Sequence, residues 1–108
     1  MSMVYEVREY VEDGRSAFGE WFDGLDPVTA ARIDCYIRRM EAGNFGASKP
    51  VGAGVFELPM DFGPGYRVYY GREGKMLVIL LGGGDKRRQS ADIAAAVERW
   101  RRYKKAKV

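Results

Sequence analysis

The chain has 108 residues, 46% hydrophobic and 31% charged, a composition typical of one folded domain and not of a disordered chain. A single cysteine excludes an intramolecular disulfide and a multi-cysteine zinc site, and the lack of histidine excludes catalytic triads and metal sites built on that residue. No apolar run approaches the roughly 20 residues that cross a bilayer, and the N-terminus shows no export signal. We therefore expect a single cytoplasmic domain over residues 1–108, without a membrane partner.

Charge is unevenly distributed along the sequence. Residues 1–34 contain eight acidic and three basic side chains, whereas the remainder contains seven acidic and fifteen basic ones, so the two parts carry −5 and +8. Such asymmetry favours a polyanion as the partner of the C-terminal part, and nucleic acid is the first candidate. The alternative is a C-terminal helix with a solvated basic face.

The N-terminal part predicts one strand and two helices. Residues 4–11 alternate as a strand does, and the following segment shows apolar residues at helical spacing. Asp26 and Pro27 suit the N-cap and first position of a second helix, which Gly43 should end. Because the connection between the helices is short, we expect an antiparallel helical hairpin.

The C-terminal part predicts three strands and a helix. After a loop over residues 43–54, alternation predicts strands at 55–60, which Pro59 should bulge or leave unpaired, and at 66–72. Residues 76–81 are apolar on both faces and predict a covered central strand. A loop of three glycines then leads to a last helix with Ser90 as its N-cap. The fold class is α+β, in the order β-α-α-β-β-β-α, with helices packed on one face of the sheet.

Two basic groups are candidates for holding a phosphate. Arg67 and Tyr69 project to the same face of one strand, and Lys86 follows the neighbouring strand. If these strands form a hairpin, Arg67 and Lys86 are neighbours, and an anion between them relieves their repulsion. Tyr69 offers a ring for base stacking. Lys49 reaches the same edge, and Arg87 and Arg88 add charge beside it.

Each of these residues also has a structural interpretation. Arg67 can form a surface ion pair, and Tyr69 can cover a hydrophobic edge. The three glycines can be a β-to-α turn that requires positive φ. Glu57 is a candidate base on the same strand system, although a salt bridge to Arg67 or Lys86 is its favoured role. Asp85 is expected to cap a turn rather than to bind metal.

Several segments together resemble the RelE/ParE superfamily of type II toxins, and most of all its HigB-like group of addiction module killer proteins. Residues 43–46, 49–52, 55–58, 62–70 and 83–86 read GNFG, KPVG, VFEL, FGPGYRVYY and GGDK. The resemblance spans nearly the whole chain. It implies a small antiparallel or mixed sheet with an N-terminal helical hairpin and a C-terminal helix.

The resemblance implies a ribosome-dependent mRNA endonuclease that needs no metal or cofactor and that a cognate antitoxin silences. The antitoxin would be acidic where it binds and would carry a helix-turn-helix part, in a heteromeric complex. Arg67 and Lys86 match two basic catalytic positions, with Tyr69 as their companion. Lys49, Arg87 and Arg88 would bind RNA.

The chain also departs from the RelE pattern. Val55 and Glu57 stand where RelE has a lysine pair, and about Asp92 stands where RelE has a late tyrosine, so the acid–base roles do not carry over. Proton transfer would fall to a lysine, tyrosine or glutamate, or electrostatic stabilisation would replace it. ParE-like members share the fold but poison DNA gyrase, which gives the alternative function. A plain RNA- or partner-binding module is a third.

Overall fold

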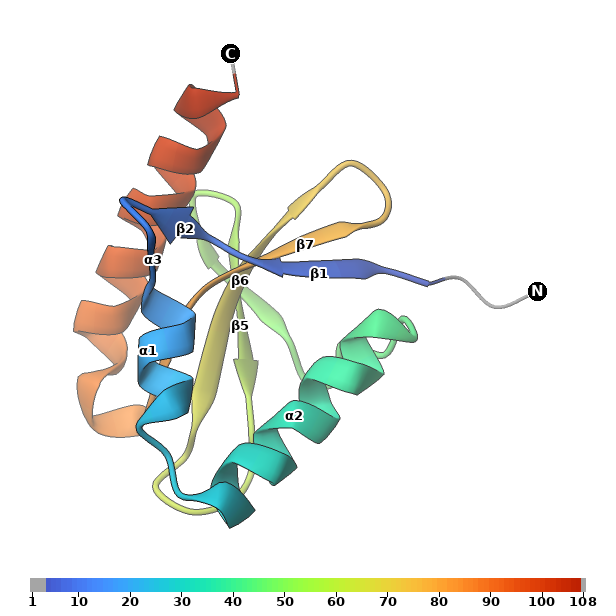
Figure 1. Ribbon diagram of the computed structural model, residues 1–108, viewed down its shortest axis with the longest axis vertical. Helices are drawn as coiled ribbons and strands as arrows, with labels where there is room; N and C mark the ends of the chain where they lie inside the picture. Colours follow the sequence, from blue (N-terminus) through green and yellow to red (C-terminus); the bar gives the residue numbers. More distant parts are fainter. Residues whose placement is uncertain (1–3, 108) are drawn as a thin grey trace.

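The computed structural model describes residues 4–107, which form an α+β fold with a mixed five-stranded sheet and three helices (Figure 1). The strands of this sheet are β1 (Glu6–Glu9), β4 (Lys49–Gly52), β5 (Val55–Pro59), β6 (Arg67–Glu73) and β7 (Leu77–Gly84). The helices are α1 (Ala17–Asp23), α2 (Pro27–Glu41) and α3 (Gln89–Ala106). The predicted fold class is confirmed at this level.

The strand order in the sheet is β1-β7-β6-β5-β4. Only β1 and β7 pair in parallel, whereas the other three pairs are antiparallel, so the sheet is mixed. The predicted hairpin of the last two strands is confirmed by β6 and β7, which place Arg67 opposite Gly84. Strand β7 lies between β1 and β6, as its apolar sequence predicted.

The N-terminal strand is shorter than predicted. After β1, the chain forms a separate small hairpin of β2 (Val11–Glu12) and β3 (Arg15–Ser16). Its turn residues Asp13 and Gly14 both have positive φ, at 54° and 74°. A two-residue turn of this kind matches the twist of the strands that it joins.

The starts and ends of the first two helices follow their capping residues. The Ser16 hydroxyl accepts from the Gly19 N–H at the start of α1, and the Asp26 carboxylate accepts from the Thr29 N–H at the start of α2. Pro27 is the first residue of α2, as predicted. The helix ends at Glu41, and Gly43 has positive φ just beyond it.

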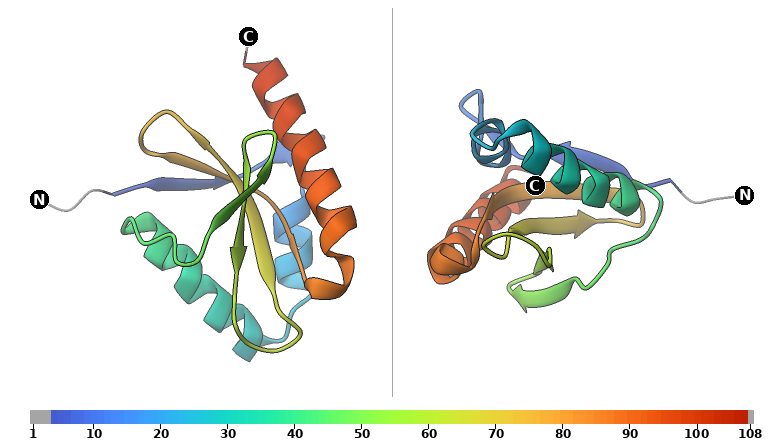
Figure 2. Two further views of the ribbon diagram at one scale, coloured as in Figure 1. Left: turned by 180° about the vertical axis from the view of Figure 1, so that it is seen from behind. Right: turned by 90° about the horizontal axis from the view of Figure 1, so that it is seen from below.

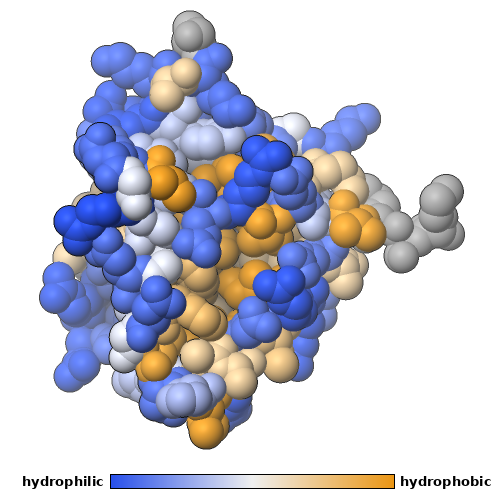
Figure 3. Space-filling view, viewed as in Figure 1, coloured by the Kyte–Doolittle hydropathy of each residue, from blue (hydrophilic) through white to orange (hydrophobic). Residues whose placement is uncertain are grey.

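The two N-terminal helices do not form the predicted antiparallel hairpin. They diverge from their connection (Figure 1), and α1 packs mainly on β7. With only seven residues, α1 is too short to pair along the fifteen residues of α2. Figure 3 shows apolar side chains between the two helices, where a hollow of about 200 Å³ reaches Phe18, Ile37 and Leu80.

Strand β4 corrects the prediction of a loop over residues 43–54. Lys49–Gly52 pairs with β5 through a two-residue turn, Ala53–Gly54, in which both residues have positive φ. The sequence hid this strand because Pro50 and Gly52 are poor strand formers. Pro59 causes no bulge: it is the last residue of β5 and pairs with Arg67 in regular register.

Helices cover both faces of the sheet, not one as predicted. Residues of α1 and α2 share a core with one face, whereas Ala96 and Trp100 of α3 pack with Val55, Tyr69 and Leu81 on the other. Figure 2 shows α2 and α3 on opposite sides of β7. The alternation of β5 and β6 explains this arrangement, because each strand sends apolar side chains to both faces. Between residues 4 and 107, no helix is long and apolar enough to span a bilayer.

Candidate functional site

The predicted site residues converge on the face of the sheet that α3 covers. Glu57 of β5 lies directly opposite Lys49 of β4 on one side and Tyr69 of β6 on the other. Cross-strand partners project to the same face, so the three side chains form one row across the sheet. Arg67, two residues before Tyr69, projects to this face as well.

Glu57 is a fully buried carboxylate held by three polar side chains. Its Oε2 lies 3.4 Å from Arg67 Nε and accepts a hydrogen bond of 2.8 Å from Gln89 Nε2. Its Oε1 lies 3.7 Å from Lys49 Nζ. The predicted salt bridge to Arg67 is thereby confirmed. A base must reach its substrate, so the role of base does not fit this buried and paired group.

Tyr69 is also fully buried, beneath α3. Its hydroxyl has no hydrogen-bond partner among the described residues. Burial raises the pKa of Tyr69 well above its usual value, and the negative charges of Glu57 and Asp92 add to the effect. The predicted stacking on RNA is wrong for this placement, because the ring has no exposed face. The alternative, that Tyr69 covers a hydrophobic region, is confirmed.

Arg67 and Lys86 meet at one hollow of about 370 Å³ beside this row. The hollow is lined by the β5–β6 connection, the ends of both strands, Lys86 and one residue of the α2–β4 loop: Ala47, Pro59, Met60, Asp61, Gly65, Arg67 and Lys86. A methyl group placed on Gly65 would lie 3.2 Å from Arg67 Nη1 and 3.4 Å from Lys86 Cβ. The prediction that Arg67 and Lys86 are neighbours is therefore confirmed.

The two cations are held very differently. The Arg67 side chain is 14% exposed, and besides its pairing with Glu57 its Nη1 donates to the Gly65 carbonyl at 2.6 Å. Lys86 is exposed, and its ammonium has no ion pair within residues 4–107. A guanidinium has five N–H donors, so Arg67 retains donors beyond those that fix it. The hollow thus combines one paired and one unpaired positive group.

The three glycines before Lys86 belong to β7 and are not the predicted loop. None of them has positive φ; the close approach of neighbouring side chains explains glycine at 83 and 84 instead. A methyl group on Gly83 would lie 2.2 Å from the Trp21 ring, and one on Gly84 would lie 2.0 Å from Asp92 Oδ2. Because α1 and α3 pack closely against the end of β7, this end has a defined position. Lys86 follows it by two residues.

A short 3-10 helix, Lys86–Arg88, leads into α3. The Asp85 carboxylate accepts from the Arg87 N–H at 2.9 Å and pairs with the Arg87 guanidinium, so its predicted capping role is confirmed. Helix α3 begins at Gln89, and Ser90 is not its N-cap. Arg87 and Arg88 are both exposed beside the hollow; that they bind RNA stays a prediction. The same holds for Lys49, whose side chain is 61% exposed.

A relative of the chain is an "Uncharacterized protein" of Haemophilus influenzae, 48% identical over 80 residues that cover 73% of this chain and 81% of the relative. The chain belongs to the same family as that protein. No known family profile matches the chain, and no solved structure matches it.

Two residues of the site, Gln89 and Asp61, were not predicted from the sequence. The sequence assigned no role to Gln89, which ends the basic segment. Its hydrogen bond to the buried Glu57 carboxylate depends on where α3 begins. Asp61 lines the hollow with Arg67 and Lys86. The position of Asp61 in the sequence could have indicated this, because it follows the end of β5 by two residues, just as Lys86 follows the end of β7 by two residues.

A larger hollow, of about 570 Å³, lies between the β1–β2 segment and the C-terminal end of α3. It contains none of the predicted site residues, and its charged lining mixes Arg8, Arg102 and Lys107 with Glu9 and Glu12. The formal charge of its lining is +1, the same as that of the hollow of Arg67, Lys86 and Asp61, so the location of the predicted site residues distinguishes the two hollows and net charge does not. No group of three potential ligands that could hold a metal ion occurs within residues 4–107.

Proposed function

We propose that this protein is the toxin of a type II toxin–antitoxin system, with a RelE-like fold, and that it cleaves mRNA on the ribosome at the hollow between Arg67 and Lys86. One observation carries the proposal: two cations from separate elements line the same hollow. Glu57 already pairs with Arg67, so the positive charge left without a partner is that of Lys86, and Arg67 adds the N–H donors that its own contacts leave free. A phosphodiester of RNA fits because its oxygens accept hydrogen bonds from both groups.

The way in which Arg67 is held suits stabilisation of a transition state. Glu57 and the Gly65 carbonyl fix the guanidinium before any ligand arrives. Donors that are already oriented need no reorganisation when charge develops on the phosphate. Lys86, exposed and unpaired in the described part of the chain, can follow the phosphate as its geometry changes.

The surroundings of the hollow suit a large polyanion. Arg87 and Arg88 follow Lys86 directly in the chain, are exposed and add positive charge next to it, although Arg87 also pairs with Asp85. Phosphate contacts of this kind supply affinity and position without reading sequence. We assign Arg87, Arg88 and Lys49 to the RNA and ribosome backbone. An acidic segment of an antitoxin would compete for the same charges.

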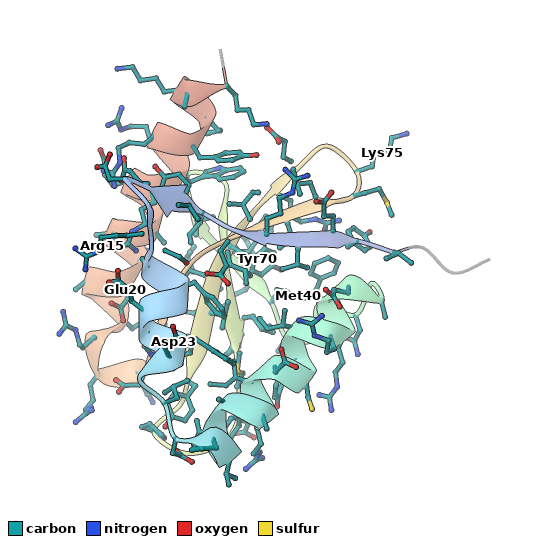
Figure 4. The ribbon with its side chains drawn as sticks, viewed as in Figure 1. Arg15, Glu20, Asp23, Met40, Tyr70 and Lys75 are labelled. Carbon is teal, nitrogen blue, oxygen red and sulfur yellow. The ribbon has the colours of Figure 1, made fainter. Side chains whose placement is uncertain are left out.

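Lys86→Ala is the sharpest test, because Lys86 is exposed and its removal disturbs no buried pair. We expect the variant to lose about 100-fold in mRNA cleavage, as when one group that stabilises a transition state is removed. Growth arrest on induction in a bacterial host should be relieved. The matched control is Lys75→Ala, at the β6–β7 turn far from the hollow (Figure 4).

The readout is the transcriptome-wide mapping of RNA 5′ ends after induction of the wild type, Lys86→Ala and Lys75→Ala. Codon-linked cuts in the wild type and the control but not in Lys86→Ala support the proposal. Equal cutting by all three rejects the site. Arg67→Ala is a weaker probe, because it leaves Glu57 buried without its closest cation and so changes the fold as well.

A gyrase-binding toxin without nuclease activity is the second candidate. The burial of Tyr69 favours it, because the hollow then lacks the tyrosine that the sequence predicted there. Induction would in that case cause DNA breaks and leave the 5′ ends of mRNA unchanged. The same induced cultures therefore separate the two candidates.

A further inference from the structure

The hollow must also provide a group that takes a proton, if RNA is cleaved there. Attack by a ribose 2′-oxygen requires that the 2′-hydroxyl lose its proton as the new bond to phosphorus forms. Arg67 and Lys86 carry positive charge and cannot accept that proton in their charged forms. The acceptor must therefore be sought among the other side chains around the hollow.

Two acceptors that the sequence offered are closed to a ligand. Glu57 is fully buried and engaged by Arg67, Lys49 and Gln89. Tyr69 is fully buried as well, and burial raises the pKa of its hydroxyl. Neither side chain is open to a ribose in the hollow.

Asp61 differs from both of them in every one of these respects. It is exposed, it lines the hollow, and its carboxylate has no hydrogen bond or ion pair to any residue between 4 and 107. Its backbone is nevertheless held in place. The Met60 N–H donates to the Tyr66 carbonyl at 2.9 Å, and the Phe62 N–H donates to the Met60 carbonyl at 3.0 Å. A free carboxylate on a fixed turn is what a general base requires.

We infer that Asp61 is the catalytic base that takes the proton of the ribose 2′-hydroxyl, an inference that rests on the proposed function. The 2′-oxygen forms a bond to phosphorus, and the bond from phosphorus to the 5′-oxygen breaks. The proton passes to the Asp61 carboxylate, and the leaving 5′-oxygen takes a proton from the Lys86 ammonium. Exchange with water restores both groups. The products are a 2′,3′-cyclic phosphate and a 5′-hydroxyl.

The charge of Asp61 argues for cleavage rather than for simple binding. A carboxylate beside a phosphate lowers affinity, because like charges repel. A site that only holds RNA gains nothing from Asp61, whereas a site that cleaves RNA gains the proton acceptor. Asp61→Asn should consequently bind programmed ribosomes as tightly as the wild type, or more tightly, while it loses cleavage.

The test compares the full-length wild type, Asp61→Asn, Asp61→Glu and Asp23→Asn on ribosomes programmed with one defined mRNA. Asp23, labelled in Figure 4, is an exposed aspartate at the end of α1 that does not line the hollow, and it is the matched control. Single-turnover cleavage and equilibrium binding are measured on the same samples. We expect Asp61→Asn to cleave at least about 100-fold more slowly, as for loss of a general base. Asp61→Glu should recover part of the rate.

The outcomes separate the two proposals. If the wild type binds but does not cleave, the proposed function fails, and the inference falls with it. If the wild type cleaves and Asp61→Asn cleaves within twofold of it, the proposed function stands and Asp61 is not the base. If Asp61→Asn loses binding and cleavage together while Asp23→Asn retains both, Asp61 acts in binding and the inference is again overturned.

Discussion

The two sides of Arg67 differ in what surrounds them. On one side lies the buried row, which we define as Glu57 and Tyr69 with the partly buried Gln89, where the Glu57 carboxylate is paired and Tyr69 packs beneath α3. On the other lies the open hollow, with Lys86 and Asp61 both exposed. The same guanidinium serves both regions. The comparison shows that a functional cation can be fixed by one set of residues while another set is left free to act.

The division predicts that substitutions in the buried row change stability, whereas substitutions in the hollow change activity. A buried charge that loses its partner is costly, because desolvation is no longer compensated. An exposed charge loses little of its hydration on folding, so its removal has a small effect on stability. Predictions for Glu57, Tyr69 and Asp92 test this division, in order of decreasing effect.

Glu57→Ala should have the largest effect. It leaves Arg67 largely buried without its carboxylate and removes the acceptor of Gln89, and we expect a loss of about 3 kcal/mol in the free energy of unfolding. Equilibrium unfolding in urea measures the loss as a lower midpoint. Glu98→Ala, which removes an exposed carboxylate paired with Arg101 on α3, is the control and should change the midpoint little.

A midpoint for Glu57→Ala equal to that of the wild type would contradict the division. It would mean that Arg67 recovers water or another acceptor at no cost. Glu57→Gln refines the measurement, because it keeps the size of the side chain and removes only its charge. If this variant also loses stability, the charge of Glu57, and not only its size, stabilises the buried row.

Tyr69→Phe should have a smaller effect and the opposite sign. A buried hydroxyl without a partner costs free energy, so its removal should stabilise the protein by about 1 kcal/mol. Tyr103→Phe is the matched control, because the Tyr103 hydroxyl donates to Glu73 Oε1 at 2.7 Å and its removal should destabilise. Urea unfolding of both variants measures the sign of each change in the free energy of unfolding. A loss of stability in Tyr69→Phe would contradict the premise that its buried hydroxyl has no hydrogen-bond partner.

The sequence predicted those parts of the fold that depend on local periodicity and capping. Alternation assigned Arg67 and Tyr69 to one face of β6, and Asp26 with Pro27 located the start of α2. The meeting of Arg67 and Lys86 could be predicted as well, because a hairpin of β6 and β7 fixes which residues lie at its end. Local patterns and one pairing were sufficient for these features.

The errors arose where tertiary packing decides. The glycines at 82–84 resemble a loop, but they pair with β6 as part of β7, and Trp21 and Asp92 occupy the space that side chains at 83 and 84 would fill. Tyr69 was assigned to an open surface because the sequence does not show that α3 crosses that face of the sheet. Asp61 was overlooked because its importance depends on which side chains share its hollow, and that is a property of the folded chain.

Asp92 is intermediate between the two regions and gives the smallest expected effect. It is partly buried where α3 begins, and burial raises its pKa above the ordinary value of 3.8, with Asp85 adding to the effect and Arg88 and Arg99 opposing it. The folded protein therefore holds this proton at pH values where the unfolded chain has released it. The stability that Asp92 contributes is complete below pH 3.8 and is lost as the pH rises through the folded-state pKa.

Asp92→Asn removes this ionisation and retains the shape of the side chain over Gly84. We expect the variant to gain stability relative to the wild type at neutral pH, and the gain to shrink as the pH falls towards 3.8. Asp26→Asn gives the opposite trend, because hydrogen bonds from Thr29 lower the pKa of Asp26 and its contribution is lost on acidification. Thermal unfolding of the three proteins across this pH range measures both trends. A gap between Asp92→Asn and the wild type that does not change with pH would contradict this prediction, because it would show that burial does not raise the pKa of Asp92. Helix α3 would then lie less closely over Gly84 in solution than its contact with that residue indicates.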